Sequence, residues 1–159
     1  MIRPESRDDH DAIRSVTARA FAGHPCSDGT EPRIIDALRA TDALVVSLVA
    51  TDGDRIVGHV AFSPVAPDWF ALGPVAVEPA LQGRGVGSRL IEAGLQQLRA
   101  RGAQGCVLLG DHRYYRRFGF VVASDLAPAH YPAEHFQILM FGASRPDRRV
   151  AFHPAFDGG

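Results

Sequence analysis

The segment that most constrains this chain is a glycine-rich turn between an apolar run and an amphipathic stretch. The turn reads Gln82-Gly83-Arg84-Gly85-Val86-Gly87-Ser88, and the apolar run before it spans 72–77. Apolar residues then recur at helical spacing, which predicts a helix from about Val86 to Arg101. Unpaired N–H groups and the dipole at a helix N-terminus attract anions, and glycines let the backbone approach one closely. The turn therefore predicts a local anion site.

Three ligand-binding motifs compete for this segment. A dinucleotide-binding fingerprint needs G-x-G-x-x-G with an acidic residue about 20 positions later, but the glycines stand at 83, 85 and 87 and no acid lies around 102–105. A nucleotide P-loop needs a lysine, and the chain contains none. The pattern Gln82-x-x-Gly85-x-Gly87 fits a pyrophosphate cradle for coenzyme A, to which Arg84 can add a charged contact. A glycine turn that binds nothing is the alternative.

The rest of the chain alternates strand-like and helix-like segments without a repeat, a low-complexity tract or a linker, so we expect one domain over residues 1–159. Apolar runs predict strands at 2–3, 44–50, 56–62, 70–77, 106–109, 120–123 and 136–141. Capping residues and helical spacing predict helices from 6–9 to about 22, from Thr30 onward, from about 86 to 101, and one turn at 114–118. This order predicts an α/β or α+β sandwich on a mixed sheet.

The predicted strand at 70–77 contains a Gly-Pro pair at positions 73 and 74. Proline cannot donate a ladder hydrogen bond, and a glycine inside a strand often marks a bulge. The pair therefore predicts a place where this strand bulges or separates from a neighbour.

Composition and charge exclude several classes of protein. Lys plus Arg number 17 against 18 Asp plus Glu, and a net charge of −1 argues against nucleic acid as a partner. No apolar run approaches the roughly 20 residues of a membrane span, and the first residues lack a secretory signal pattern, so we expect a cytoplasmic protein without a membrane partner. We expect Cys26 and Cys106 to be free, non-catalytic thiols. The seven histidines lack metal-ligand spacing, so we expect no metal.

A second motif lies downstream of the glycine turn. It reads Tyr115-Arg116-Arg117-Phe118-Gly119-Phe120. Together with the turn, which matches the pattern [R/Q]-x-x-G-x-[G/A], it resembles the GNAT superfamily of acyl-CoA-dependent N-acetyltransferases. The stretches 72–77 and 151–156 and the doubled Tyr114-Tyr115 are similar to a bacterial subgroup often called YhbS-like. The resemblance covers essentially the whole chain and is strongest over 52–120.

The resemblance implies a GNAT-like fold, in which a mixed, mainly antiparallel sheet splays at its fourth and fifth strands and is flanked by helices. It also implies acetyl-CoA as co-substrate, with its pyrophosphate on the glycine turn. The pantetheine arm would lie between the splayed strands and pair with backbone groups there. The residues implied in cofactor binding are Val75, Ala76, Val77, Gln82, Gly83, Arg84, Gly85, Val86, Gly87, Ser88 and Tyr114.

Acetyl transfer to an amine requires a neutral amine, a stabilised oxyanion and protonation of the leaving thiolate. By resemblance, Tyr115 is the general acid for the thiolate, and a backbone N–H near Val75 is the oxyanion donor. Many members of the family carry an asparagine seven residues before this tyrosine, where the present chain has Leu108.

The general base is less clearly marked. Some relatives carry a glutamate on the fourth strand, but the equivalent stretch here is apolar, at 70–72. Glu31, at the start of the second predicted helix, is the candidate that we carry forward, and water-relayed deprotonation is a further route. The other candidates are Asp28, His59 and Asp111.

The expected activity is direct transfer of an acetyl group from acetyl-CoA to a primary amine, on a small molecule or a peptide, in a ternary complex. The alternative is a non-catalytic acyl-CoA-binding sensor or regulatory module, which the lack of an obvious base favours. We expect the loop 23–30 and the C-terminal segment to shape the acceptor site. The segment 131–136 could add to that wall or form a homodimer contact.

Overall fold

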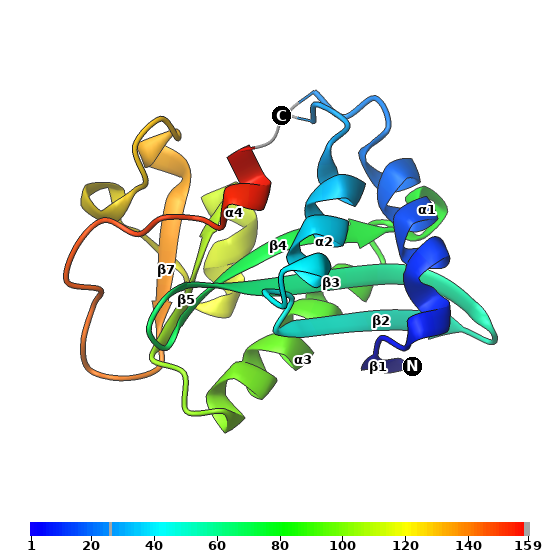
Figure 1. Ribbon diagram of the computed structural model, residues 1–159, viewed down its shortest axis with the longest axis horizontal. Coiled ribbons are helices and arrows are strands. Elements are labelled where there is room, and N and C mark those ends of the chain that lie inside the picture. Colours follow the sequence, from blue (N-terminus) through cyan, green and yellow to red (C-terminus); the bar gives the residue numbers. More distant parts are fainter. Residues whose placement is uncertain (26, 158–159) are drawn as a thin grey trace.

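The fold is organised around one mixed sheet, described here from a computed structural model that places residues 1–25 and 27–157 (Figure 1). Within those residues the strand order is β1-β2-β3-β4-β5-β7-β6. Neighbouring strands are antiparallel, except that β4 and β5 are parallel. The strands are β1 (Ile2–Pro4), β2 (Val46–Asp52), β3 (Arg55–Ala66), β4 (Trp69–Val77), β5 (Gly105–Leu109), β6 (Val121–Val122) and β7 (Phe136–Met140).

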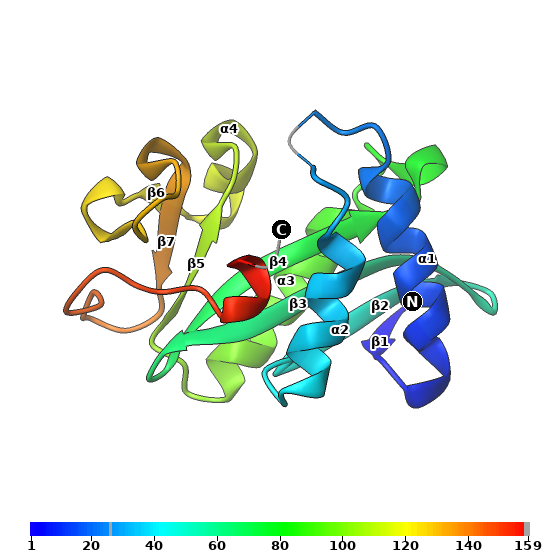
Figure 2. The ribbon, with the colours of Figure 1, turned by 45° about the horizontal axis from the view of Figure 1, so that its top comes forward.

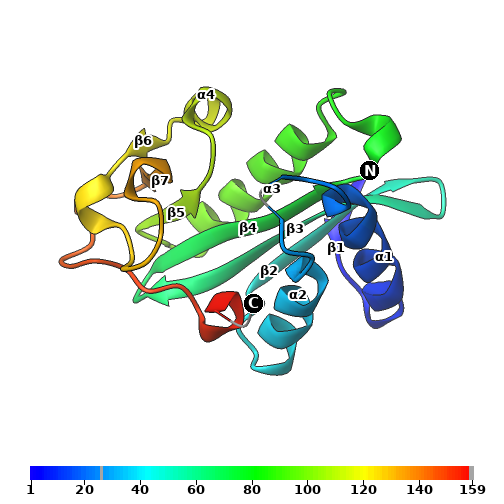
Figure 3. The same cartoon turned by 90° about the horizontal axis from the view of Figure 1, so that it is seen from above.

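Helices cover both faces of the sheet (Figure 3). α1 (His10–Phe21) and α2 (Glu31–Ala40) lie on one face, and α3 (Val86–Ala100) lies on the other. α4 (His112–Tyr115) follows β5. Short 3₁₀ turns occur at Arg7–Asp9, Pro79–Leu81, Arg116–Phe118, Ser124–Leu126, Ala133–His135 and Pro154–Asp157, the last labelled η6. Within the residues placed, every helix is too short or too polar to cross a bilayer.

Each long helix buries the apolar stripe that its sequence predicts. α3 packs on β2 and β3 through Leu90, Ile91, Leu95 and Leu98. On the opposite face, α1 and α2 pack on the sheet through Ile13, Val16 and Ile35. Burying one such side chain contributes about 1.5–3 kcal/mol. These contacts therefore hold a helical layer on each side of the sheet, and the predicted order of strands and helices is confirmed.

The end of β3 differs from the prediction. The sequence predicts a strand over 56–62, but β3 continues past Pro64 to Ala66. The pairing with β2 ends at Phe62, so only β4 lies beside the last residues of β3. Proline is tolerated where one edge of a strand is unpaired, which explains why Pro64 does not end it.

The predicted separation of strands is present at Gly73 and Pro74. The pairing of β3 with β4 shifts between Val60↔Val75 and Phe62↔Leu72, so β4 carries an extra residue there, and the Gly73–Pro74 peptide bond is cis. β4 pairs with β5 only over the three residues Trp69–Ala71. Beyond them the two strands diverge (Figure 2), as expected for the fourth and fifth strands of a GNAT-like sheet.

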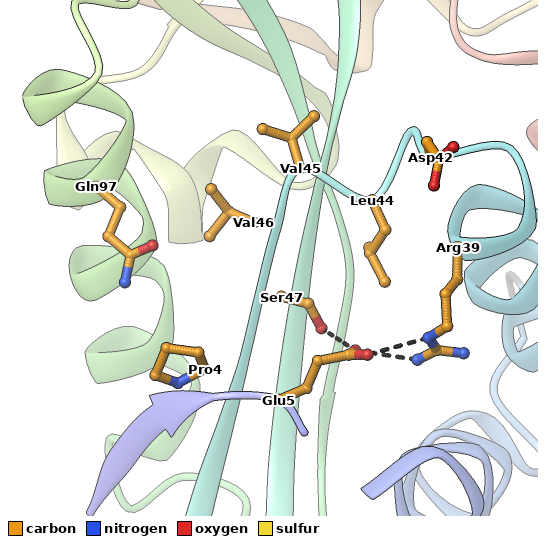
Figure 4. Close-up of a pocket in the computed structure, with 9 residues that line it drawn as sticks. All are labelled: Pro4, Glu5, Arg39, Asp42, Leu44, Val45, Val46, Ser47 and Gln97. Atoms are coloured by element: carbon orange, nitrogen blue, oxygen red, sulfur yellow. Dashed lines mark hydrogen bonds and ion pairs between the residues drawn. The ribbon is translucent and has the colours of Figure 1, made fainter. Parts of the chain in front are cut away.

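A partly buried polar network joins Glu5, which follows β1, to residues of β2, β3 and α2. Glu5 accepts a hydrogen bond from the Ser47 hydroxyl and two from Arg39, at 3.0 Å each (Figure 4). They line a cavity of about 360 Å³. His59 Nε2 lies 2.7 Å from Ser47 Oγ. Because the Ser47 proton is directed to Glu5, the His59 ring is the donor to Ser47, and Nε2 carries the hydrogen.

His59 is fully buried, and its Nδ1 has no hydrogen-bond partner among the residues that the structure places. Burial lowers the pKa of His59 to about 4; the Glu5 carboxylate opposes this shift and the Arg39 charge adds to it. An unfolded histidine has a pKa of about 6.5. Between these two values the unfolded chain binds a proton that the folded chain does not, so stability is lost as pH falls.

We expect the free energy of unfolding to fall by roughly 2–3 kcal/mol between pH 7 and pH 4.5 because of His59 alone. The test is urea unfolding of the wild type and of His59→Gln at both pH values. Glutamine keeps a donor for Ser47 but does not titrate. The stability difference between the two proteins should change by that amount, in favour of the variant at low pH. An equal difference at both pH values would contradict the role of His59.

Candidate active site

The glycine turn forms an open helix N-terminus. Gly85 is the residue that caps α3, and its φ of +85° is one that glycine adopts without strain. Its carbonyl accepts the hydrogen bond from the Arg89 N–H at 3.1 Å, and no described side chain caps the helix. The first N–H groups of α3 are therefore available to an anion, as predicted for this segment.

The turn borders a cavity of about 490 Å³, which we call the turn cavity. Its other walls are the end of α1, the last residues of β4, and the two tyrosines of α4. Two of the residues implied in cofactor binding are not among its lining residues, namely Ala76, which is buried, and Arg84, which is exposed. The others line it: Val75, Val77, Gln82, Gly83, Gly85, Val86, Gly87, Ser88 and Tyr114.

The edge of β4 that faces this cavity is not paired with another strand that the structure describes. The Glu78 N–H donates to the Val57 carbonyl on β3 at 2.8 Å. Backbone groups along a strand point alternately to its two edges, so those of Val75 and Val77 point away from β3. β5 has already diverged on that side. The Val77 carbonyl accepts a hydrogen bond from Gln82 Nε2 at 3.1 Å, which ties the turn to the strand.

Tyr114 and Tyr115 have different environments, although they are adjacent. The Tyr114 hydroxyl lies 2.9 Å from Ser88 Oγ, and the Arg117 guanidinium lies 4.1 Å from the centre of its ring. Tyr115 also lines the turn cavity, but its hydroxyl makes no hydrogen bond to any residue that the structure places. Burial raises the pKa of Tyr115 to about 12. Tyr115 thus presents a protonated phenol whose hydrogen is not already donated.

Arginine side chains place positive charge around the turn cavity. Arg117 lines the turn cavity, and an Arg89 nitrogen lies 3.1 Å from where a Cβ on Gly85 would stand. Arg84 and Arg89 form no ion pair within the described part of the chain. The motif Tyr-Arg-Arg was the signal that could have identified Arg117 as a site residue, but the sequence alone did not assign it a role.

A second cavity lies on the α2 side of the splayed strands and has a volume of about 230 Å³. We call it the aromatic cavity. Glu31 lines it, and Glu31 Oε1 accepts a hydrogen bond from the Ser27 hydroxyl at 2.7 Å. Phe21 lines both this cavity and the turn cavity. The other lining residues are Ile34, Ala71, Leu72, Gly73, Pro74, Leu109, Tyr131, Phe152 and Phe156.

The other candidates for the base lie in different surroundings. Asp28 accepts hydrogen bonds from the backbone and hydroxyl of Thr30, which lower its pKa. Asp111 caps α4, and its ion pair with Arg113 lowers its pKa. His59 belongs to the buried network on β3. Glu31 is therefore the candidate that the fold brings to a cavity beside the splay.

The structure describes one of the two cysteines that we expect to be free, non-catalytic thiols. Cys106 is a free thiol inside the core, and burial raises its pKa far above its usual range, which makes it a poor nucleophile. Cys26 lies outside the described residues.

Leu108, which stands where many members of the family carry an asparagine, is buried in the core. Among residues 1–25 and 27–157, no three His, Cys, Asp or Glu side chains gather where a metal ion could bind.

Comparison with known proteins agrees with the resemblance drawn from the two motifs. The model of the acetyltransferase (GNAT) family matches residues 11–120. The crystal structure of a GNAT family acetyltransferase from Brucella melitensis in complex with acetyl-CoA has a TM-score of 0.89 and 48% identity, over 99% of this chain and 97% of that chain. The GNAT family N-acetyltransferase YhbS from Escherichia coli, in complex with CoA, has a TM-score of 0.87 and 30% identity, over 99% and 91%. In sequence, the "uncharacterized N-acetyltransferase YhbS" of Escherichia coli K12 is 34% identical over 130 residues, which are 78% of this chain and 75% of that protein.

Proposed function

This chain belongs to the acetyltransferase (GNAT) family, and we propose that it transfers an acetyl group from acetyl-CoA to a primary amine by direct attack in a ternary complex. The observation that carries this proposal is that one cavity joins the open N-terminus of α3, the edge of β4 that β5 has left, and Tyr115. These are the groups needed for a pyrophosphate, a pantetheine arm and a leaving thiolate.

The cofactor binds, in this proposal, with its pyrophosphate on the N–H groups of residues 85–88. Arg89 and Arg117 supply positive charge beside it. The pantetheine amides pair with the outward backbone groups of Val75 and Val77, as an added strand pairs with a sheet edge. The complexes of the Brucella melitensis and Escherichia coli relatives with acetyl-CoA and CoA support this placement.

Gly87→Val should weaken acetyl-CoA binding by at least about tenfold while the fold is retained. The family pattern allows alanine at this position, so the larger, branched side chain of valine is the informative change. Gly87 has an ordinary helical backbone, and its new Cβ would meet Val77 at 3.5 Å and the Tyr114 hydroxyl at 3.7 Å, which are ordinary contacts. Valine also has a higher helix propensity than glycine. The branched side chain therefore affects mainly the space that the pyrophosphate needs. Calorimetric titration with acetyl-CoA, beside a thermal unfolding curve, measures both effects.

Gly85→Ala is the comparison for this experiment. Gly85 has a positive φ, so a side chain there strains the backbone with or without a ligand. We expect this variant to lose stability as well as affinity. An unchanged affinity in folded Gly87→Val would contradict the placement of the pyrophosphate.

The proposed reaction balances without a metal or a covalent enzyme intermediate. The amine nitrogen attacks the thioester carbonyl carbon, a C–N bond forms, and the carbonyl electrons move to oxygen. The Val75 N–H stabilises this oxyanion. The oxyanion then collapses, the C–S bond breaks, and the thiolate leaves with the electron pair. The nitrogen loses one proton to a base, and sulfur gains one.

Tyr115 is the proposed general acid for the leaving thiolate. Tyr115→Phe removes only the hydroxyl, so packing and acetyl-CoA affinity should be retained while turnover falls by about 10²–10⁴-fold. The pKa of about 12 keeps the phenol protonated throughout the working pH range. A thiolate needs less help to leave in alkaline solution, so the deficit should shrink as pH rises. Turnover at saturating substrates, from pH 7 to pH 10, is the measurement.

Tyr114→Phe is the matched control, because it removes the neighbouring hydroxyl, which lies against Ser88 rather than being free. Its turnover should fall much less than that of Tyr115→Phe. If Tyr114→Phe lowers turnover and Tyr115→Phe does not, the two roles are reversed. If neither change matters, sulfur is protonated by water or by another side chain.

Glu31 is the proposed base, acting on the amine directly or through one water. We expect Glu31→Gln to lower kcat/KM by about 10²-fold near pH 7, where most amine carries a proton that must be removed. The deficit should diminish toward pH 10, as the amine loses that proton to solvent. The pH profile of kcat/KM measures this change. Ser27→Ala is the milder control, because it removes only the hydroxyl that donates a hydrogen bond to Glu31. A deficit that is equal at pH 7 and pH 10 assigns Glu31 to binding rather than to proton removal.

The release of coenzyme A thiol in the presence of amines is the experiment that tests the activity itself. A non-catalytic acyl-CoA sensor, the alternative drawn from the sequence, binds the cofactor but releases no thiol with any amine.

A further inference from the structure

We propose that the acceptor is an arylalkylamine-like compound, a primary amine on a short chain attached to an aromatic ring, without a carboxylate beside the amine. The inference rests on the proposed function, because it names the amine that enters the aromatic cavity. Its ring would lie among the aromatic side chains, and its amino group would face Glu31. Four properties of that cavity lead to this class of substrate.

The first property is the chemistry of the walls. Rings from three parts of the chain meet there, from Phe21 at the end of α1, from Tyr131, and from Phe152 and Phe156 in the C-terminal segment. Most of the remaining wall is aliphatic. Aromatic rings pack edge to face and offset against one another with a gain beyond the burial of area alone. Such walls favour a flat apolar body over a sugar or a polyamine.

The second property is the charge. Among the described residues that line the aromatic cavity, Glu31 is the one with a charged side chain. Tyr131 is a neutral phenol, and burial together with its hydrogen bond to Asp157 raises its pKa to about 12. A substrate carboxylate would meet no cation there and would lie in the same small space as Glu31. An amino group, in contrast, finds a carboxylate and aromatic faces, both of which attract a cation.

The third property is the size. A cavity of about 150 Å³ holds benzene, so the 230 Å³ of the aromatic cavity is enough for a six-membered ring and an aminoethyl chain. A substrate of this size places its amine two or three bonds from the ring. It can therefore reach from the aromatic wall to the splayed strands, where Gly73, Pro74 and Leu109 line the same cavity.

The fourth property is that the wall is held in place before a substrate arrives. The Phe152 ring lies 5.3 Å from Tyr131, 6.3 Å from Phe136 and 5.7 Å from Phe156, measured between ring centres. The C-terminal segment contacts the residue that follows α2, because Thr41 Oγ1 lies 3.1 Å from His153 Nε2. Figure 2 shows η6 lying beside α2, over the sheet. A preformed wall costs little ordering entropy when the ligand binds.

The test is a panel of amines with acetyl-CoA, with thiol release as the readout. The panel contains 2-phenylethylamine, L-phenylalanine, 2-aminoethanol and spermidine. L-Phenylalanine has the ring and the amine and adds only the carboxylate, so it isolates the effect of charge. 2-Aminoethanol lacks the ring. We expect kcat/KM for 2-phenylethylamine to exceed that of each other amine by at least about tenfold.

Matched variants locate the preference in the wall. Phe152→Leu keeps an apolar side chain but removes the ring, and it should reduce the preference for 2-phenylethylamine over 2-aminoethanol by at least about fivefold. Phe141→Leu is the control: it makes the same change at a ring that contacts the Arg99 guanidinium and does not line the aromatic cavity. It should leave the preference between the two amines unchanged. A ratio between two substrates does not respond to a general loss of stability, so it separates recognition from folding.

Calorimetry with acetyl-CoA, done in parallel, separates the two proposals. If acetyl-CoA binds and L-phenylalanine, 2-aminoethanol or spermidine is the preferred acceptor, the inference is overturned and the transferase activity stands. An unchanged preference in Phe152→Leu also overturns it. If acetyl-CoA binds but no amine in the panel leads to release of the coenzyme A thiol, the inference fails, and the result favours a non-catalytic acyl-CoA sensor. Failure to bind acetyl-CoA overturns the proposed function itself.

Discussion

The short parallel pairing between β4 and β5 is the constraint on which the rest of the site depends. Only Trp69–Ala71 pairs with β5, and the extra residue at Gly73–Pro74 then alters the course of β4. β3 continues to pair with the other edge of β4 through Ala76 and Val77. β4 can therefore leave β5 while it stays rigidly in the sheet. An unpaired strand edge normally invites aggregation, but here it forms a wall of a cavity.

Two cavities border this opening and share Phe21 as a lining residue, and different elements form the rest of their walls. α3 begins beside the open edge of β4 and brings the glycine turn to it. On the other face, α2 and the C-terminal segment enclose the aromatic cavity, and Phe21 at the end of α1 lines both cavities. In the proposed reaction, the cofactor and the amine approach the thioester carbon from these two sides. The fold thus separates the two binding sites without separating the reacting atoms.

The parts of the site that are local in sequence could be predicted residue by residue, whereas for the parts that depend on distant residues the sequence indicated only the segments of the chain. The glycine turn and the break at Gly73–Pro74 follow from backbone requirements of a few adjacent residues, and both are present. The aromatic cavity combines Glu31 with Tyr131, Phe152 and Phe156, which lie about 100 or more positions away. No periodic pattern connects them, because side chains meet there only after the tail has packed on α2. Similarly, the pattern indicated Arg84 as a phosphate contact, which stays a prediction, but it did not indicate that Arg117 lines the turn cavity.

The adjacent tyrosines show how one helical turn can place the same side chain in two different environments. Successive residues of a helix point about 100° apart, so Tyr114 reaches Ser88 at the start of α3, while Tyr115 enters the core beside Phe120. Burial holds the Tyr115 ring in one place, and the same burial raises its pKa to about 12. A thiol has a pKa of about 8.5, so transfer of the phenolic proton to a free thiolate is unfavourable as a step on its own. In the proposed reaction, Tyr115 therefore first donates a hydrogen bond that strengthens as charge builds on sulfur. Its proton then passes to sulfur as the C–S bond breaks, and the proton that the amine nitrogen gives up restores the phenol.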